Sequence, residues 1–494
     1  MALSSSCDRP NWRLFLLAFL SPAKALPFFG FGIVSAFVAD LTPTGAHAQY
    51  FARVEGAYAL EFYDMDFSAL ADPAKRIGPL DALHYMPIGP DSATYLSFGG
   101  EFRQQVWSWS HEAHGLRGPT ADTYDLSRLL IDAYLHLDRH LAIFVQLGRY
   151  DAFGKVAPLN PADASEGRLQ QGFLELKELL LGSVDVMARL GRQEIALGSS
   201  RFVWVNDSSN IRTAHDGARL EFRAETGATL DLVATRPTVS VAQAFDDWQS
   251  HTGTFLAAYA SMPLLVHQLS VDEYFFVTHT TAAQYAGLIG NETRETLGGR
   301  IWGSLADFTY DSDFAYQFGS FANLPIAAFG TSTRVAYGFP ALPWRPALQF
   351  QTSYFSGSSG PPGNPRTIGT FDPPFPRATM LNYVGLETLE NLIEAYPALI
   401  LNAAPNVALR LGPEAMWRAS IYDAVYVSRT VPLPATTKNI ARYIGTNLVV
   451  AATWTVNDNL RIFVEYVHEV AGPAIILAGG HGSDAGIMQM DFNF

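Results

Sequence analysis

The stretch RLLIDAYLHLD, from Arg128 to Asp138, alternates between two kinds of side chain. Its odd-numbered residues are all apolar, whereas most even-numbered ones are polar and include Asp132 and His136. Successive side chains of a β-strand point to opposite faces. This stretch therefore predicts a strand with one apolar face and one mostly polar face.

The same alternation recurs along the chain and predicts eighteen strands. We expect them at 95–109, 125–138, 140–150, 167–178, 183–192, 216–225, 227–236, 252–262, 266–278, 295–305, 307–321, 328–338, 347–356, 379–388, 404–417, 440–454, 459–468 and 485–494. Bacterial outer-membrane barrels contain an even number of such strands, each of about ten alternating residues. The fold class that this pattern predicts is all-β, a transmembrane antiparallel β-barrel of about 18 strands.

The amino-acid composition argues against several other classes of protein. The 494 residues are 48% hydrophobic but only 16% charged, against roughly 25% charged in typical soluble domains. After the N-terminal region, no run reaches the ~18 apolar residues that a spanning helix needs, which argues against a helical membrane protein. The net charge of −14 argues against a nucleic-acid partner. Of the 33 basic residues, 28 are Arg. Two explanations of this excess of Arg stay open: the base composition of the genome, and a channel lumen that binds carboxylates.

The N-terminus has the pattern of a secretory signal. Residues 1–48 combine basic residues, the 14-residue apolar run Leu26–Ala39 and the small-residue cleavage pattern Ala46-His47-Ala48. We expect cleavage there, so that residues 49–494 form the barrel in the outer membrane of a Gram-negative cell. The only cysteine, Cys7, lies in the removed segment, which excludes disulfides and cysteine metal sites from the mature chain.

Three segments depart from the strand rhythm: 49–92, 193–215 and 356–378. Residues 49–92 are irregular and predict a lead-in before the barrel. Residues 193–215 predict a long connection rich in polar residues. Residues 356–378 are rich in Pro and Gly and must form a loop. Residues 387–401 favour a short helix before Pro397. Long loops of this kind often fold into a barrel and narrow its pore.

The final strand carries a second signal. In AGIMQMDFNF, from Ala485 to Phe494, Met488, Met490 and Phe492 share one face with Phe494, which is the last residue. This ending resembles the C-terminal signature that the barrel assembly machinery reads. We therefore expect Phe494 to act as an assembly signal, and outer-membrane lipid to contact the apolar face.

Four blocks of sequence resemble the alginate export family of outer-membrane barrels. They are GTFDPPFPR at 369–377, the stretch from Arg168 that contains Leu190 to Gln193 and Asp216 to Arg219, the segment 79–103, and ARYIGTNLVVAATW at 441–454. The resemblance implies an 18-stranded barrel with a positive lumen that conducts a polyanionic uronate polysaccharide.

Lumen-facing arginines are the candidate substrate-binding residues. They are Arg103, Arg128, Arg189, Arg219, Arg223, Arg300, Arg410 and Arg461 on strands, with Arg192, Arg201, Arg212 and Arg377 near the loops that would form the constriction. Charged residues on the lipid face cost about 2–4 kcal/mol near the midplane, which favours inward placement. The acidic residues expected to pair with them are Glu101, Asp132, Glu221 and Glu465. Each arginine either contacts substrate or only makes a structural salt bridge, and the sequence leaves both open.

We therefore expect a channel that passively conducts an alginate-like polyuronate or another anionic solute, with periplasmic export proteins as further partners. A general or small-anion porin is the alternative, and an outer-membrane enzyme or a sealed structural barrel is a less favoured one. The sequence contains no G-x-S-x-G, H-E-x-x-H or P-loop motif, so we expect no enzyme activity. No cofactor or metal site is expected; loop carboxylates leave room for calcium, but no EF-hand spacing is present.

Overall fold

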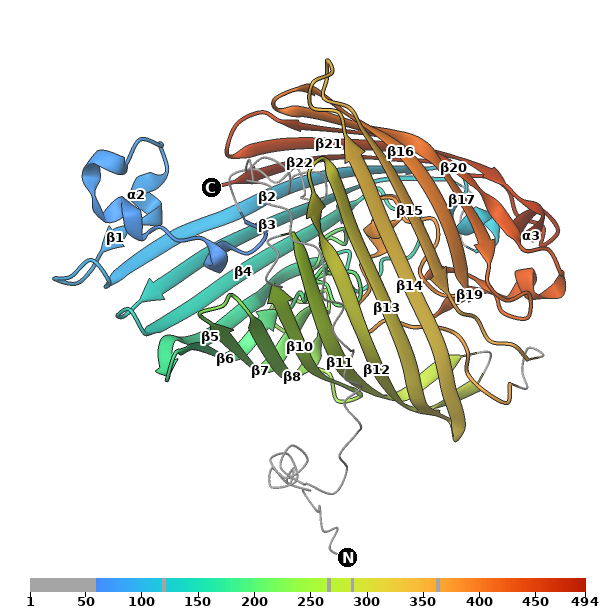
Figure 1. Cartoon of the computed structure of the whole chain (residues 1–494), viewed down its shortest axis with the longest axis horizontal. Coiled ribbons are helices and arrows are strands. Elements are labelled where there is room, and N and C mark those ends of the chain that lie inside the picture. Colours follow the sequence, from blue (N-terminus) through green and yellow to red (C-terminus); the bar gives the residue numbers. More distant parts are fainter. Residues whose placement is uncertain (1–58, 118–120, 264–267, 286–287, 361–364) are drawn as a thin grey trace, which may run out of the picture. The chain divides into compact units, whose positions relative to one another are not determined.

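The fold is an 18-stranded closed antiparallel β-barrel, as predicted. The computed structural model describes residues 59–117, 121–263, 268–285, 288–360 and 365–494, and the predicted signal at 1–48 lies outside them. The barrel strands are β2 (Tyr95–Trp109), β3 (Asp122–His136), β4 (Leu141–Phe153), β5 (Ser165–Leu181), β6 (Val184–Glu194), β7 (Ala214–Ala224), β8 (Thr229–Val239), β10 (Gly253–Pro263), β11 (Leu269–Tyr285), β12 (Leu288–Leu305), β13 (Phe308–Phe321), β14 (Leu324–Gly338), β15 (Ala347–Phe355), β16 (Leu392–Ala404), β17 (Val407–Arg418), β20 (Tyr443–Thr455), β21 (Leu460–Ala471) and β22 (Asp484–Asn493). Figure 1 shows these strands side by side around one ring.

The remaining elements are short. Strand β1 (Met86–Pro87) pairs with β2, β9 (Trp248–Gln249) pairs with β8, and β18 (Val425–Ser428) pairs with β19 (Val431–Leu433). The helices are η2 (Phe62–Asp64), η3 (Ser68–Ala71), η4 (Pro73–Lys75), α2 (Asp81–His84), η5 (Glu112–Gly115), η6 (Ala378–Met380), η7 (Pro434–Lys438) and α3 (Pro473–Ile476). Among the described residues, no helix is long and apolar enough to cross a membrane.

The first and last barrel strands close the ring. β2 pairs antiparallel with β22 from Glu101 opposite Asn493 to Trp109 opposite Ala485. Beyond the strand end, Gly100 N–H donates to the carbonyl of Phe494 at 2.7 Å. Closure leaves no unpaired edge facing hydrocarbon, which is the condition for a sheet to span a membrane.

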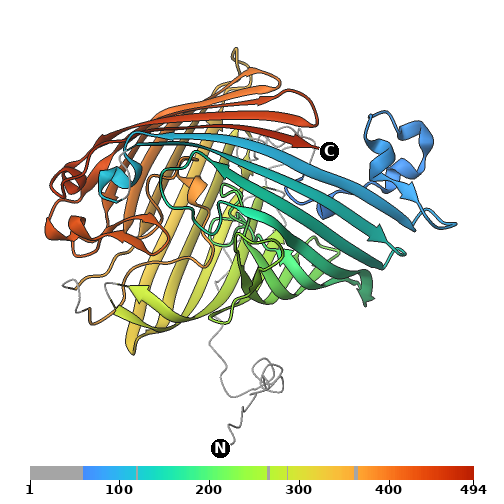
Figure 2. The same ribbon diagram turned by 180° about the vertical axis from the view of Figure 1, so that it is seen from behind.

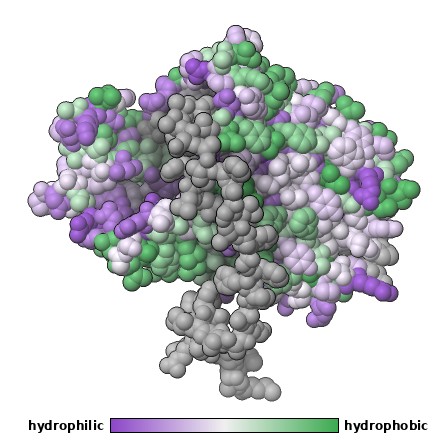
Figure 3. Space-filling model, in the orientation of Figure 1, coloured by the Kyte–Doolittle hydropathy of each residue, from purple (hydrophilic) through white to green (hydrophobic). Residues whose placement is uncertain are grey.

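Alternating burial confirms the two-faced strands. Along β3 the even-numbered residues from Asp122 to His136 are buried, whereas Leu129 and Ile131 are 37% and 50% exposed. The outer surface carries many such apolar side chains, and Figure 3 shows residues of high hydropathy as green patches among paler ones. The apolar face thus lies outside the barrel, and the mostly polar face lines the lumen.

One strand lies elsewhere than predicted. The expected strand 379–388 is not formed, and its residues belong to a loop that reaches residue 391. The helix expected over 387–401 is wrong because β16 occupies 392–404. In β16, Leu392, Glu394 and Tyr396 are buried while Pro397 points outward. Pro397 lacks an N–H and would break a helix interior. It is tolerated here because the pairing of β16 with β17 is interrupted between Ala395 and Leu399, so the missing N–H is not needed for the ladder.

Gly412 allows a close approach of two strands. A Cβ atom added there would lie 2.1 Å from the carbonyl oxygen of Pro397 and 2.9 Å from Cα of Ala398. We expect Gly412→Ala to lower the free energy of unfolding by about 1–3 kcal/mol, as overpacking usually does, and to reduce refolding yield. Urea unfolding in lipid vesicles measures it. Gly167→Ala is the control, because its nearest contact would be 3.5 Å away; equal effects of both variants would contradict the steric argument.

The connections differ at the two rims of the barrel. One rim, the short-turn rim, carries turns such as 182–183, 306–307 and 405–406. The opposite, long-loop rim carries the connections 195–213, 356–391 and 419–442. Residues 195–213 are called the first inner loop and the described residues of 356–391 the second inner loop, because coil segments run inside the ring of strands (Figure 2).

Candidate functional site

The two inner loops join inside the lumen. Trp204 N–H donates to the carbonyl of Phe375 at 2.9 Å, Phe375 N–H to that of Phe202 at 3.0 Å, and Arg377 N–H to that of Arg201 at 3.1 Å. Val203 and Phe375 are bridge partners in parallel orientation. A short segment of paired backbone, formed by residues 201–204 and 375–377, therefore lies inside the lumen.

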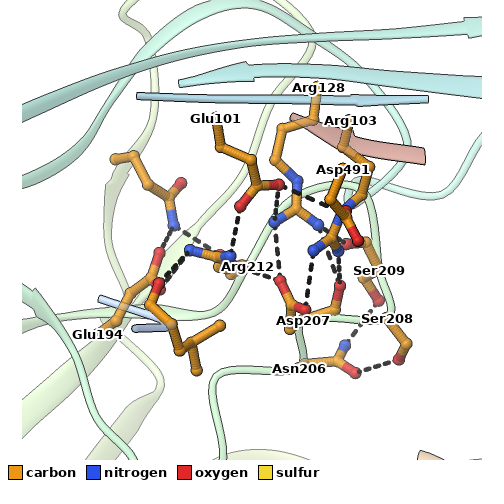
Figure 4. A network of polar contacts seen from close by, with 12 residues as sticks. Glu101, Arg103, Arg128, Glu194, Asn206, Asp207, Ser208, Ser209, Arg212 and Asp491 are labelled. Atoms are coloured by element: carbon orange, nitrogen blue, oxygen red, sulfur yellow. Dashed lines mark hydrogen bonds and ion pairs between the residues drawn. The ribbon is translucent and has the colours of Figure 1, made fainter. Parts of the chain in front are cut away.

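Asp207 ties the first inner loop to the barrel wall. Its carboxylate accepts from Arg103 of β2 at 3.1 Å, from Arg128 of β3 at 2.9 Å and from Arg212 of the same loop at 2.6 Å. All three arginines are at most 3% exposed. Figure 4 shows these guanidinium groups converging on the single carboxylate.

Two further carboxylates complete this network. Glu101 Oε2 lies 2.8 Å from Nη2 of Arg212, and Asp491 Oδ1 lies 2.5 Å from Nε of Arg103. Arg461 adds a fourth guanidinium, with Nη2 at 2.7 Å from Oδ2 of Asp491. The charges balance closely, so this part of the lumen is held by ion pairs and offers few free cationic groups to a solute.

The first inner loop also reaches another wall. Arg201 makes ion pairs with Asp311 and Asp313 of β13, and Ser199 Oγ donates to Asp313 at 2.9 Å. Asp207 lies six positions after Arg201, a span of at most about 20–22 Å. A single short segment thus connects β13 with β2 and β3.

The second inner loop is anchored through Asp372. Its carboxylate accepts from Arg429 Nε at 2.7 Å, and its backbone exchanges hydrogen bonds of 2.9 and 2.7 Å with the side chain of Gln317 on β13. Burial raises the pKa of the Asp372 carboxyl, but Arg429 and Arg294 outweigh it and hold this pKa below its usual value. Asp372 therefore stays ionised and keeps the loop in place.

An arginine-lined cavity lies between the inner loops and the short-turn rim. Its volume is about 410 Å³, and Ser304 and Thr309 beside the turn 306–307 line its outer end. The arginines in its lining are Arg201, Arg300, Arg334 and Arg377. Among the described residues, the only acidic one in the lining is Asp311, which pairs with Arg201 and Arg300. Guanidinium groups dominate the polar surface of this cavity.

A larger cavity lies toward the long-loop rim. Its volume is about 790 Å³, and aromatic side chains such as Trp107, Tyr124 and Tyr383 line it. Trp204 also lines it, and the guanidinium of Arg377 lies 5.1 Å from the centroid of the Trp204 ring. Since Arg377 lines the first cavity and Trp204 the second, this stacked pair lies where the two cavities approach each other.

The predicted lumen arginines face inward, and most of them are paired. Eleven of the twelve candidate arginines make an ion pair with a carboxylate: Arg103, Arg128, Arg189, Arg192, Arg201, Arg212, Arg219, Arg223, Arg300, Arg410 and Arg461. Glu101, Glu221 and Glu465 are among the partners, but the described contacts of Asp132 include no ion pair. Arg223 lies at the strand end with 63% of its side chain exposed, so it is a rim residue.

Sequence reasoning missed several residues of this site. Asp207 lies in a loop without periodicity, and its role depends on partners 104 and 79 residues away. Trp204 and Arg334 also went unnoticed as lining residues. The polar composition of 193–215 was the one available signal, and it indicated a loop without showing where the loop would lie.

Structural comparison shows the fold of outer-membrane porins. Similar solved structures are OccAB1 of Acinetobacter baumannii (TM-score 0.55, 10% identity, 84% of this chain and 99% of that one) and OccK8 (OprE) of Pseudomonas aeruginosa (0.52, 9%, 81% and 98%). OccK2 (OpdF) of P. aeruginosa in complex with glucuronate is also similar (0.52, 10%, 81% and 98%). No curated protein matches the sequence.

The sequence itself matches a family. Residues 94–488 match the Alginate export family, and this range extends from the first barrel strand into the last one. Both this family and the porins above are transport channels, not enzymes. The chain therefore belongs to the alginate export family and is a β-barrel solute channel of the outer membrane.

Proposed function

We propose that this channel conducts an anionic solute, and specifically a uronate-containing saccharide. The observation that carries the proposal is the arginine-lined cavity, where Arg300, Arg334 and Arg377 converge on one space of about 410 Å³. Rings of Arg and Lys favour anions in pores. Guanidinium groups also bind carboxylates in a planar, bidentate geometry that suits a uronate.

The comparisons support the proposal without fixing the substrate. The family is named for alginate export, and alginate is a polymer of uronates. OccK2 was solved with glucuronate, a single uronate, but at 10% identity its likeness supports the fold alone. A polyuronate and a single uronate present the same carboxylate, so oligomers of several lengths are needed to distinguish them.

Arg377 is the proposed point of passage between the two cavities. It is held over Trp204 and donates from Nε to Thr379 Oγ1 at 3.3 Å. A carboxylate that leaves the arginine-lined cavity would exchange one guanidinium contact for the next at this position. Such weak, successive contacts are what conduction needs, because tight binding would hold the solute in the pore.

Bilayer recording tests this function. We expect a refolded, single barrel in a KCl gradient to be anion-selective and to be blocked by oligouronate but not by a neutral glucan. Arg377→Gln should weaken the block about tenfold or more, since a hydrogen bond to a charged group contributes about 1.5–3 kcal/mol. Arg223→Gln is the control, because the side chain of Arg223 is exposed at the rim.

Other outcomes would favour the alternatives. A cation-selective current, or one that oligouronate does not block, would remove the uronate proposal and make a general porin the leading function. Absence of any current would indicate a sealed barrel. Block by a monomer alone, with longer oligomers ineffective, would restrict the substrate to small anions. Binding of assembly machinery to Phe494 and of periplasmic partners stays a prediction.

A further inference from the structure

A second buried cluster lies near the long-loop rim, away from the arginine-lined cavity. It brings together His114 of the β2–β3 connection, Glu387 of the second inner loop and Glu469 of β21. The three residues are 0%, 1% and 3% exposed. One potential ligand atom from each lies within 4.8 Å of the others.

The imidazole of His114 lies between the two carboxylates. Its Nδ1 is 3.0 Å from Oε2 of Glu469, and its Nε2 is 3.5 Å from Oε1 of Glu387. When Nδ1 carries the proton, it donates to Glu469, and the lone pair of Nε2 points toward Glu387. A carboxylate on one ring nitrogen that fixes the other for a metal is a recurrent arrangement at metal sites.

Several buried oxygen atoms in this cluster have no hydrogen-bond partner among the described residues. They include both carboxylate oxygens of Glu387 and Oε1 of Glu469. The same holds for Oε1 of Glu414 and Oδ1 of Asn447, which are next to them in the sheet: Glu414 is opposite Asn447, and Asn447 is opposite Glu469. Buried polar atoms are almost always paired, so a group of unpaired oxygens requires an explanation.

The charge of the cluster points to a cation. Within the described part of the chain, Glu387, Glu414 and Glu469 make no ion pair with an arginine or a lysine. Other lumen carboxylates, such as Asp207 and Asp491, do have guanidinium partners. Burying an ionised carboxylate without a counter-charge is costly. One imidazolium supplies a single positive charge, whereas a dication supplies two and leaves only one of the three carboxylates uncompensated.

We propose that Nε2 of His114 and the carboxylate of Glu387 ligate a divalent transition-metal ion of the zinc class, while Glu469 holds the imidazole in place through Nδ1. One imidazole nitrogen and carboxylate oxygens are a ligand set that Zn²⁺ accepts. Calcium prefers six to eight oxygen ligands, and the central imidazole makes it a poorer match. Glu414 and Asn447 lie nearby and offer further oxygen atoms.

The bound ion would fasten three segments that are far apart in sequence. His114 belongs to a connection at the long-loop rim, Glu387 to the second inner loop and Glu469 to the wall strand β21. The ion would therefore hold residues 382–390 of the second inner loop against the wall. This role does not depend on which solute the channel conducts.

Metal titration of the purified barrel tests the site. We expect tag-free, chelator-stripped protein to bind one Zn²⁺ with micromolar or tighter affinity by calorimetry in the presence of a competing chelator. Glu387→Gln should weaken Zn²⁺ binding more than about 100-fold. Replacing a residue that only hydrogen-bonds to a ligand typically costs about 10–100-fold. His114→Ala should abolish Zn²⁺ binding. His481→Ala is the control, because His481 is an exposed histidine close to His111.

Thermal unfolding separates loss of a ligand from loss of the fold. Without metal, Glu387→Gln should be at least as stable as the native chain, because it removes a buried charge. With Zn²⁺, the native chain should gain stability and the variant should not. Equal Zn²⁺ binding by the native chain, Glu387→Gln and His114→Ala, or absence of binding, would overturn the site. Calcium binding that His114→Ala leaves intact would overturn the zinc class.

Discussion

Replacing Asp207 with alanine should strongly destabilise the first inner loop and, with it, the folded barrel. Asp207 is the shared partner of Arg103, Arg128 and Arg212, and its removal leaves three buried guanidinium groups short of negative charge. Removing one partner of a buried ion pair typically costs about 3–5 kcal/mol. We expect the midpoint of urea unfolding in vesicles to fall accordingly.

The same substitution should change conduction. The substitution removes the carboxylate contacts of the segment 201–207 with β2 and β3 and leaves, among the described contacts, only the hydrogen bonds of Arg103 and Arg128 to backbone carbonyls, so we expect larger and noisier single-channel currents. Asp151→Ala is the matched control, because its partner Arg149 is 59% exposed and exposed pairs contribute about 0–1 kcal/mol. Unchanged stability and current in the Asp207 variant would mean that the network does not hold the loop.

Excision of the second inner loop should have the largest effect on conductance. Tyr354 of β15 and Ile393 of β16 are already opposite each other, so a short Asn-Gly link can join the two strands without altering the wall. Barrels with 16–18 strands leave an aqueous channel when nothing fills them. We therefore expect a barrel that still folds, with conductance raised several-fold and oligouronate block lost.

A second excision provides the control for this variant. Residues 340–345 form an exposed turn at the short-turn rim, and shortening it should leave conductance and block unchanged. Planar-bilayer conductance and heat-modifiable migration on SDS gels measure pore size and folding in both variants. If the loop-excised barrel folds but conducts like the native chain, the second inner loop does not restrict the pore.

The barrel could be predicted because its signal is local. Each strand carries its own alternation, and lipid outside with polar groups inside imposes that alternation on every strand. The prediction failed at β16, where Pro397 suggested the end of a helix although the alternation of Leu392, Glu394 and Tyr396 already indicated a strand. A proline is compatible with a strand where the ladder does not need its N–H, as at the interruption of the β16–β17 pairing.

The interior was predictable only in part. Alternation assigns Arg103 and Arg128 to the lumen, but it does not say which carboxylate each one meets. That partner, Asp207, comes from a loop whose path depends on tertiary contacts across the barrel. The same limit applies to the cluster of His114, Glu387 and Glu469, since no spacing in the sequence relates residues so far apart.

The first inner loop has a mechanical consequence. In the ring of eighteen strands, β3 and β13 are nine positions apart and so lie on opposite sides. Arg201 forms an ion pair with Asp313 of β13, and Asp207 forms one with Arg128 of β3. The segment between them therefore acts as a strut across the diameter of the barrel. A ring of strands with nothing across its middle has only its wall to oppose distortion into an ellipse. A strut fixed at both ends resists that flattening and keeps the cross-section of the pore constant.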